Sequence, residues 1–191
     1  GQGAFTAAMI MSNQKLFRYN IVWQKTKPTG FLNANRMPLR SHEDIMVFYK
    51  ALPVYNPQKS TGHTHVHSFT KHSSDGSNYG ATKRGISGGG ATERFPTSVW
   101  RFASDTQKSA LHPTQKPLAL CRYAIRTYTQ PGDLVLDNCC GSGSIPAAAA
   151  LEGRRYIGMD NGACKKEGSP YFGRPWAEIA TERIATLLEA A

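Results

Sequence analysis

Two acidic residues follow short apolar stretches in the second half of the chain. Asp137 ends the stretch DLVLD (133–137), and Asp160 ends the stretch RRYIGMD (154–160). Each stretch has the length and the apolar content of a buried strand. A carboxylate at the end of a strand accepts hydrogen bonds from an ammonium group or from sugar hydroxyls. Asp137 is therefore a candidate acceptor for an amino group, and Asp160 for the hydroxyls of a ribose.

A glycine turn, Gly141-Ser142-Gly143, lies between the two acids and leads into SIPAAAALEG, which predicts a helix. Glycines here let the backbone approach a ligand, and the first turn of a helix offers unpaired N–H groups. The third glycine of a dinucleotide site and the lysine of a phosphate loop are both missing, so a pyrophosphate ligand is disfavoured. S-adenosylmethionine has both of these groups, an amino group for one acid and a ribose for the other, so it fits the pattern. The alternative is a structural strand-turn-helix without a ligand.

The elements that must position these residues alternate between strand and helix in the second half. The patterns predict a helix at 4–14, strands at 17–25 and 44–50, a helix between Pro117 and Pro131, strands at 133–137 and 154–160 on either side of a further helix, and a last helix near 175–190. This order predicts an α/β fold of the Rossmann-like type, with a mostly parallel sheet and helices on both faces.

The composition changes between about 51 and 110, where Gly, Ser, Thr, His and Lys replace residues that could form a core. A segment of this length without regular structure is usually functional or disordered. His63, His65 and His67 would share one face of an extended stretch, with His72 close by, and could hold a metal. Solvent-facing or phosphate-contacting histidines are the better interpretation in a basic polar loop, so we expect no metal site.

The charge balance indicates a polyanionic partner. The chain has 191 residues and a net charge of +10. A strongly basic domain of this size most often binds nucleic acid, and a basic surface without a ligand is the alternative. No apolar run is long enough to predict a membrane-spanning helix. The cysteines, Cys121, Cys139, Cys140 and Cys164, lack the spacing of a metal site, so we expect free thiols in a reducing cytoplasm.

Three motifs, in order, resemble those of the permuted-order (beta-type) amino-methylating DNA methyltransferases, which act on adenine N6 or cytosine N4. They are HPTQKP (112–117), the glycine turn DNCCGSG (137–143) and RRYIGMD (154–160). The stretch VWQKTKPTGFLNANRMPLRSHEDIMVFYK (22–50) is similar to the hairpin region of the same family. The resemblance implies S-adenosylmethionine as the cofactor, double-stranded DNA as the partner, no membrane association, and a cytoplasmic enzyme of bacterial or phage type.

The resemblance also implies site residues and an organisation of the chain. The implied cofactor-binding set is Asp137, Cys139, Gly141, Ser142, Gly143 and Asp160, with His112, Thr114, Gln115 and Lys116 closing over the methionine end. Asn138-Cys139 replaces the family's Pro-Phe, which removes an aromatic wall beside the cofactor. The candidate phosphate contacts in the polar segment are Lys59, Lys71, Lys83, Arg84, Arg94 and Lys108. The implied parts are 1–50 as the end of the catalytic subdomain, 51–110 as the target-recognition segment and 111–191 as the cofactor-binding part.

The family's catalytic motif, (D/N/S)-P-P-(Y/F), is absent from these residues. SPYF (169–172) and YNPQ (55–58) each lack the second proline, and turn residues are the better interpretation of both. In the permuted order this motif lies upstream, so we expect the chain to be the C-terminal portion of a methyltransferase, incomplete on its N-terminal side and inactive alone. Two alternatives stay open: a non-catalytic cofactor-binding or DNA-binding remnant or subunit, and a methyltransferase that acts on RNA or protein.

Overall fold

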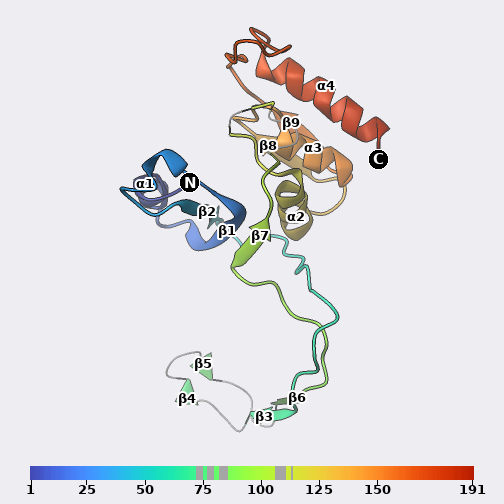
Figure 1. Ribbon diagram of the computed structural model, residues 1–191. Helices are drawn as coiled ribbons and strands as arrows, with labels where there is room; N and C mark the ends of the chain where they lie inside the picture. The colour runs from blue at the N-terminus through green and yellow to red at the C-terminus, as the bar shows by residue number, and fades with distance from the viewer. Residues whose placement is uncertain (72–74, 77–79, 82–85, 106–110, 113) are drawn as a thin grey trace. The chain divides into compact units, whose positions relative to one another are not determined.

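The computed structural model of this protein describes residues 1–71, 75–76, 80–81, 86–105, 111–112 and 114–191, with the backbone alone for those described between 69 and 86. The chain divides into two compact units. One unit consists of Gly1–Asn56 and Thr97–Ala191, and the other of Pro57–Pro96. Figure 1 labels the helices and strands of both units.

The first part of the larger unit is a small sheet with one helix beside it. Its elements are α1 (Ala4–Ser12), β1 (Phe17–Thr29), the short 3-10 helix η1 (Phe31–Asn33), β2 (Arg40–Phe48) and β7 (Val99–Phe102), and the strand order is β2-β1-β7. β2 runs antiparallel to β1, which pairs Ile21 with Ile45, and β7 runs parallel to β1, which pairs Trp23 with Trp100. Ile21, Trp23 and Trp100 are buried together with Leu120, so this sheet contributes one hydrophobic core.

The strand β7 lies inside the segment whose composition predicted no core. VWRF (99–102) is apolar at alternate positions, but the surrounding glycine, serine and histidine dominate the average composition of 51–110. Trp100 nevertheless packs in the core of the larger unit, with its ring 4.8 Å from that of Tyr123. The compact polar unit is therefore shorter than the polar segment and spans Pro57–Pro96.

The second part of the larger unit has the predicted alternation of strands and helices. Its elements are α2 (Leu118–Tyr128), β8 (Leu134–Asp137), α3 (Ser144–Leu151), β9 (Arg155–Gly158) and α4 (Trp176–Glu189). β8 and β9 are parallel and are joined through α3, which packs against both strands and against α2 and α4 (Figure 1). The strand-helix-strand prediction for 133–160 is confirmed. The alanines at 147–149 are almost completely buried, because small side chains let these elements approach one another closely.

One face of the β8–β9 pair is exposed in this unit. Leu136 and its partner on β9, Ile157, lie side by side on that face and are both exposed, as is Leu134. Val135 points to the opposite face and packs with α2 and α3. Among the described residues β8 pairs with β9 alone, so its other edge presents backbone groups that a further strand can bind.

The smaller unit, Pro57–Pro96, is built from short antiparallel pairs. β3 (Phe69–Lys71) pairs with β6 (Ile86–Gly88), and β4 (Asp75–Gly76) pairs with β5 (Gly80–Ala81). Nearer its ends, Ser60 and Arg94 exchange backbone hydrogen bonds of 3.0 and 2.9 Å. No helix in the described part of either unit is long and apolar enough to cross a membrane.

Gly143 provides a test of how α3 and α4 pack. Its φ is +76°, and a Cβ placed there would lie 2.7 Å from the Cβ of Ala180 on α4. Gly153 has a φ of +73° with open space around it, so Gly153→Ala measures the backbone strain by itself, which costs about 1–2 kcal/mol. Gly143→Ala should lower the free energy of unfolding by at least about 1 kcal/mol more than Gly153→Ala, because the added methyl overpacks the helix contact. Urea unfolding of the two variants measures this difference, and equal losses would contradict the contact.

Candidate functional site

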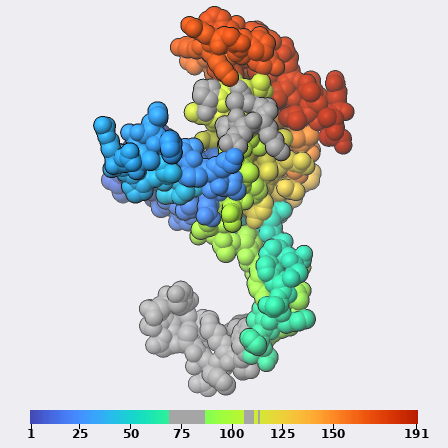
Figure 2. Space-filling view, viewed as in Figure 1, coloured from blue at the N-terminus to red at the C-terminus, as the bar shows by residue number. Residues whose placement is uncertain are grey.

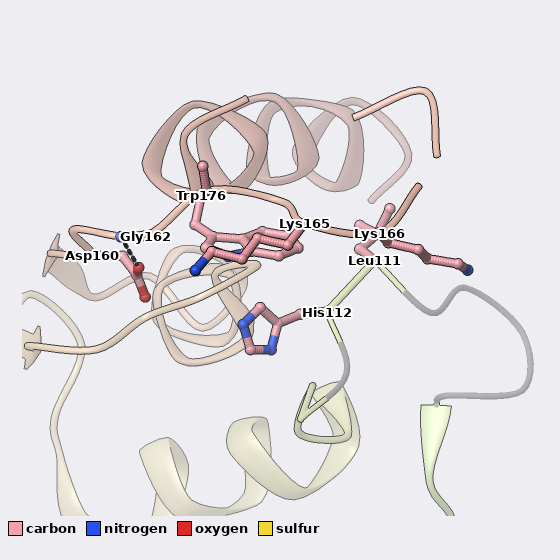
Figure 3. Close-up of a pocket in the computed structure, with 8 residues that line it drawn as sticks. Leu111, His112, Asp160, Gly162, Lys165, Lys166 and Trp176 are labelled. Carbon is pink, nitrogen blue, oxygen red and sulfur yellow. Dashed lines mark hydrogen bonds between the residues drawn. The ribbon is translucent and has the colours of Figure 1, made fainter. Parts of the chain in front are cut away.

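Two cavities that share His112 lie beyond the carboxyl ends of β8 and β9. The smaller has a volume of about 250 Å³ and is lined by His112, Thr114, Gln115, Lys116, Asp137, Cys139, Cys140, Gly141, Ser142, Ser144 and Ile145. The larger has a volume of about 720 Å³ and is lined by Leu111, His112, Asp160, Gly162, Ala163, Lys165, Lys166 and Trp176 (Figure 3). Ligands of open α/β sheets bind at this end of the strands, because the chain leaves room there between successive connections.

Asp137 places a buried carboxylate in the smaller cavity. It is the last residue of β8, and its Oδ1 accepts a hydrogen bond of 3.2 Å from the backbone N–H of Cys139. Burial raises the pKa of Asp137; the Cys139 N–H opposes this rise, and the nearby charge of Asp160 adds to it. A cation bound beside Asp137 would therefore relieve an unfavourable buried charge.

Gln115 supplies the opposite kind of group to the same cavity. Its side chain is buried, and its Oε1 accepts a hydrogen bond of 3.1 Å from Ser142 Oγ. Its Nε2 is buried and has no hydrogen-bond partner among the described residues. A buried donor without a partner is costly, so it indicates a ligand atom that accepts a hydrogen bond. The smaller cavity thus offers an acceptor for a cation and a donor for an anion, which is the pattern that an α-amino acid requires.

Asp160 joins the glycine turn to the loop that follows β9. Its Oδ2 accepts from the backbone N–H of Gly141 and its Oδ1 from that of Gly162, both at 2.8 Å. Gly141 has a φ of +50°, and a Cβ there would lie 3.3 Å from the ring of His112. The turn therefore needs glycine for its conformation and for its close approach to the neighbouring segment.

Arg183 holds the other side of the glycine turn from α4. Its Nη1 donates to the carbonyl oxygen of Ser142 at 2.9 Å and to Ser144 Oγ at 3.1 Å. Burial lowers the pKa of this guanidinium, although nearby acids oppose the shift. The sequence contains a signal for this role that the prediction missed. Arg183 lies seven residues after Trp176, on the apolar face of the last helix, where a charged residue needs a buried partner.

His112 and Trp176 form the boundary of the larger cavity. Their rings meet edge to face with centroids 4.4 Å apart. Figure 3 shows both side chains at the cavity. Burial lowers the pKa of His112, and the charge of Asp160 offsets part of this effect. The backbone N–H of Thr114 donates to His112 Nδ1 at 3.2 Å, so the neutral ring carries its proton on Nε2. The larger cavity consequently has a largely apolar wall that contains two rings inclined to each other, with a carboxylate, Asp160, at one side.

The loop between Asp160 and α4 brings two lysines to the larger cavity. The backbones of Cys164, Gly173 and Arg174 close this loop, with Cys164 N donating to Arg174 O at 2.9 Å and Gly173 N donating to Cys164 O at 2.8 Å. Lys165 and Lys166 follow the first of these residues and line the cavity (Figure 3). Neither lysine was predicted, because the only signal in the sequence is a basic pair in a loop.

Most of the predicted cofactor residues meet at one place. Eight of them line the smaller cavity: His112, Thr114, Gln115, Lys116, Asp137, Cys139, Gly141 and Ser142. Asp160 lines the larger cavity, while Gly143 lines neither of the two and instead faces Ala180 on α4. Pro113 lies outside the described residues. Trp176 is the first residue of α4, and its ring lies both against Ile179 and at the cavity.

Lys116 is also part of an ion-pair cluster with β1 and β2. Its Nζ lies 2.8 Å from Glu43 Oε2, and the Nζ of Lys25 lies 2.8 Å from Glu43 Oε1. Burial by itself would raise the pKa of Glu43, but Lys116 and Lys25 together outweigh burial and hold this pKa below its usual value. The segment 112–117 is thus anchored to the sheet of the first part through Lys116 and to the glycine turn through Gln115.

The predicted phosphate contacts lie partly outside the described residues. Lys83, Arg84 and Lys108 are among those outside, and of Lys71 only the backbone is described. Lys59 Nζ pairs with Glu93 at 2.9 Å, and Arg94 donates to the carbonyl oxygens of Ala91 and Glu93 at 2.9 Å within the smaller unit.

The histidines predicted not to form a metal site make local contacts where they are described. The Nε2 of His63 lies 2.6 Å from Ser60 Oγ, and the Nδ1 of His65 lies 2.8 Å from the carbonyl oxygen of Gly90. His72 lies outside the described residues. In the rest of the chain as described, no three His, Cys, Asp or Glu residues are placed to hold a metal ion. All four cysteines are free thiols.

Relatives of known sequence cover parts of this chain. The DNA adenine methyltransferase YhdJ of Escherichia coli K12 is 38% identical over 73 residues, which are 36% of this chain and 24% of that protein. The type II methyltransferase M.BglII of Bacillus subtilis is 28% identical over 153 residues, which are 75% of this chain and 38% of that protein. The chain therefore spans well under half the length of either relative.

Solved methyltransferase structures share the fold of this chain. The complex of M1.HpyAVI with SAM has a TM-score of 0.56 at 22% identity and covers 95% of this chain and 68% of that one. The cytosine-N4-specific PvuII DNA methyltransferase has a TM-score of 0.55 at 14% identity and covers 98% of this chain and 63% of that one. The predicted Rossmann-like methyltransferase fold is confirmed. The expected single, mostly parallel sheet with helices on both faces is not what the described residues form: β2-β1-β7 and β8-β9 are separate sheets, β1 and β2 are antiparallel, and one face of the β8–β9 pair is exposed.

A family model described as DNA methylase, of the N6/N4 type, matches residues 2–166. This match includes the glycine turn, both acidic strand ends and the segment 112–117, which are the motifs that carried the resemblance. Since the match extends over most of the sequence, this chain belongs to the N6/N4 DNA methylase family.

Proposed function

We propose that this chain binds S-adenosylmethionine as part of an enzyme that methylates the exocyclic amino group of adenine or cytosine in double-stranded DNA. The observation that carries the proposal is the pairing, in one cavity, of the buried Asp137 carboxylate with the unpartnered Nε2 of Gln115. A zwitterionic amino acid satisfies both groups at once, and few other ligands do. The adjoining larger cavity has the volume and the apolar wall that a nucleoside requires.

The residues divide the cofactor between the two cavities. In the smaller one, Asp137 accepts from the α-ammonium group and Gln115 Nε2 donates to the carboxylate. In the larger one, Asp160 accepts from the ribose hydroxyls, because an ionised carboxylate with two backbone donors keeps further lone pairs. His112 and Trp176 form the wall against which the adenine ring lies.

Direct methyl transfer depends mainly on how the protein orients the two reactants. S-adenosylmethionine would supply a methyl group bound to a sulfonium sulfur: the amino nitrogen bonds to the methyl carbon as the carbon–sulfur bond breaks, the thioether S-adenosylhomocysteine leaves, and the nitrogen loses a proton. The protein must hold that methyl group in line with a base turned out of the duplex. Asp160 and Arg183 contribute by fixing the glycine turn from both sides, so the ends of the cofactor are held by one rigid assembly.

We propose that the polar acceptor for the target amino group is not one of these 191 residues, because their sequence contains no (D/N/S)-P-P-(Y/F) tetrapeptide. The exposed edge of β8, with Leu134, Leu136 and Ile157 on its open face, is the place at which a strand that carries this acceptor would pair. A chain without that strand binds the cofactor but aims nothing at its methyl group.

The relatives support both possible target bases. One relative is named as a DNA adenine methyltransferase, and one structure with the same fold is named as cytosine-N4-specific. In both bases the acceptor is an exocyclic amino group, so the same cofactor geometry serves either reaction. The unit Pro57–Pro96 is the proposed target-recognition part, because it is compact and polar and contributes no residue to the lining of either cofactor cavity.

Replacing Gln115 should separate binding from folding. Gln115→Leu removes the unpartnered buried donor, which is favourable, and also the acceptor of the Ser142 Oγ bond, which is unfavourable, so the two effects offset and the free energy of unfolding should change by less than about 1 kcal/mol. Affinity for S-adenosylmethionine should fall about 5- to 150-fold, which is about 1–3 kcal/mol for a lost bond to a charged group. Adenosine lacks the methionine part and should bind the variant as it binds the unaltered chain. Calorimetric titration measures the affinity of the variant for both ligands. If the affinities for S-adenosylmethionine and adenosine fall equally, Gln115 does not bind the methionine part of the cofactor.

Cofactor affinity should depend on pH through Asp137, whose burial raises its pKa above the ordinary 3.8. Only the ionised carboxylate binds an ammonium group, so affinity should decline on acidification at a higher pH than an unburied aspartate would give. The free energy of unfolding should change with pH in the opposite direction to cofactor affinity. The folded state holds this proton more tightly than the unfolded chain, so the destabilisation present above the raised pKa is relieved as the pH falls towards 3.8. Asp137→Asn should abolish both dependences in titrations and unfolding curves, and unchanged slopes would contradict the assignment.

Removing the smaller unit should leave the cofactor site intact. Ser60 and Arg94 pair in antiparallel fashion, so an Asn-Gly turn can replace residues 61–93 without separating the ends. The shortened chain should bind S-adenosylmethionine with unchanged affinity and bind DNA with no preference among duplex sequences. Calorimetry and competition between duplexes measure the two properties. A shortened chain that keeps its sequence preference would place target recognition elsewhere.

A further inference from the structure

The turn between β1 and β2 carries exposed apolar side chains on an ordered backbone. We define the hairpin tip as residues 27–40, which include η1. Phe31 is 80% exposed and Leu32 is 98% exposed, and Met37 and Leu39 are exposed as well. Asn33 N donates to Gly30 O at 2.9 Å and Met37 N donates to Asn33 O at 3.0 Å, so the tip has a defined conformation that holds these side chains away from the core. In Figure 2 the tip lies at the outer edge of its unit, in light blue.

The hairpin tip is also purely cationic. From residue 26 to residue 42 the sequence contains Lys27, Arg36 and Arg40 and no aspartate or glutamate. In the part of the chain that the structure describes, the guanidinium groups of Arg36 and Arg40 make no ion pair. The nearest acid along the chain, Glu43, is already paired with Lys25 and Lys116. The positive charges of Arg36 and Arg40 therefore remain available to a partner.

Apolar groups and cations together select one class of partner. Single exposed apolar residues are normal on protein surfaces, but several on one short turn indicate a contact surface. A protein partner would fit the apolar groups, but it would have to supply acids for the cations. Nucleic acid supplies both, because phosphates bind the cations and unstacked bases present flat apolar faces.

We propose that the hairpin tip is a DNA-contacting element, in which Phe31 and Leu32 pack against bases opened from the stack while Arg36 and Arg40 bind backbone phosphates. This inference rests on the proposed function, since methylation of an amino group inside a duplex requires the target base to leave the stack. Apolar side chains that enter between bases stabilise an opened step. The tip is separate in sequence from the unit Pro57–Pro96, so the DNA contact extends beyond the target-recognition part.

The test uses residues 1–191 and four variants in two matched pairs. Phe31→Ser with Leu32→Ser removes the apolar groups, and Arg36→Gln with Arg40→Gln removes the charges. Leu52→Ser and Lys15→Gln are the controls, because Leu52 is 84% exposed and both residues flank the opposite end of the β1–β2 hairpin. All the substituted side chains are exposed, so thermal unfolding should be unchanged.

Fluorescence anisotropy measures the affinity of each variant for fully paired duplexes and for duplexes with one mismatched pair, in which a base leaves the stack at lower cost. Comparison of the two duplexes should distinguish the apolar contacts with bases from the arginine contacts with phosphates. The unaltered chain should prefer the mismatched duplex, and the Phe31–Leu32 variant should lose about tenfold in affinity for it. The Arg36–Arg40 variant should weaken binding to both duplexes and reduce the slope of log affinity against log salt by about 0.9 for each phosphate that it no longer binds. The two control variants should behave as the unaltered chain does.

Several outcomes would overturn the inference. If the unaltered chain binds DNA and S-adenosylmethionine but the tip variants bind DNA equally well, the tip is not a DNA contact and the proposed function stands. If the tip variants change the oligomeric state in light scattering without changing DNA affinity, the tip is a protein interface. If the unaltered chain binds the cofactor but no DNA, the inference fails together with the DNA-directed part of the proposed function.

Discussion

The site depends on one carboxylate that binds two backbone amides. Asp160 accepts from Gly141 and from Gly162, and these bonds join the glycine turn after β8 to the loop after β9. They act together with the backbone bonds between Cys140 N and Met159 O, at 2.9 Å, and between Met159 N and Asp137 O, at 2.8 Å, which join the same two segments closer to the strand ends. The same carboxylate faces the larger cavity, so the group that builds the site also lines it.

The segment 112–117 connects parts of the larger unit that are far apart in the sequence. Gln115 accepts from Ser142 in the glycine turn, Lys116 pairs with Glu43 on β2, and His112 contacts Trp176 at the start of α4. Each contact involves a different element. The cavity walls are therefore connected to the sheet of the first part by direct contacts, which is the arrangement that a reaction controlled by orientation requires. The pKa of His112, lowered by burial, keeps this connecting ring neutral near pH 7.

The surface of the unit separates into regions with different chemistry. The open face of β8 and β9 is apolar and has an unpaired strand edge among the described residues, so it is suited to pair with a further strand. The hairpin tip is apolar and cationic, which suits a polyanion with flat apolar surfaces. The larger cavity combines an aromatic wall, a carboxylate and two lysines. The charged groups distinguish the partners that these three regions can bind, because the apolar groups by themselves would fit many partners.

The sequence by itself determined the strand-turn-helix around Gly141, the two acidic strand ends and the alternation of elements after residue 117, because those features follow from local periodicity, glycine and capping preferences. It also marked most residues of the smaller cavity through the resemblance. Only the tertiary structure decided that Arg183 and Trp176 belong to the site, that Gly143 serves helix packing, that Lys116 pairs with Glu43, and that β7 joins the core. These are contacts between residues that lie between 37 and 77 positions apart. Local sequence patterns do not identify which distant residue will contact a buried charge, a ring or a strand edge, because these partners are selected by tertiary packing.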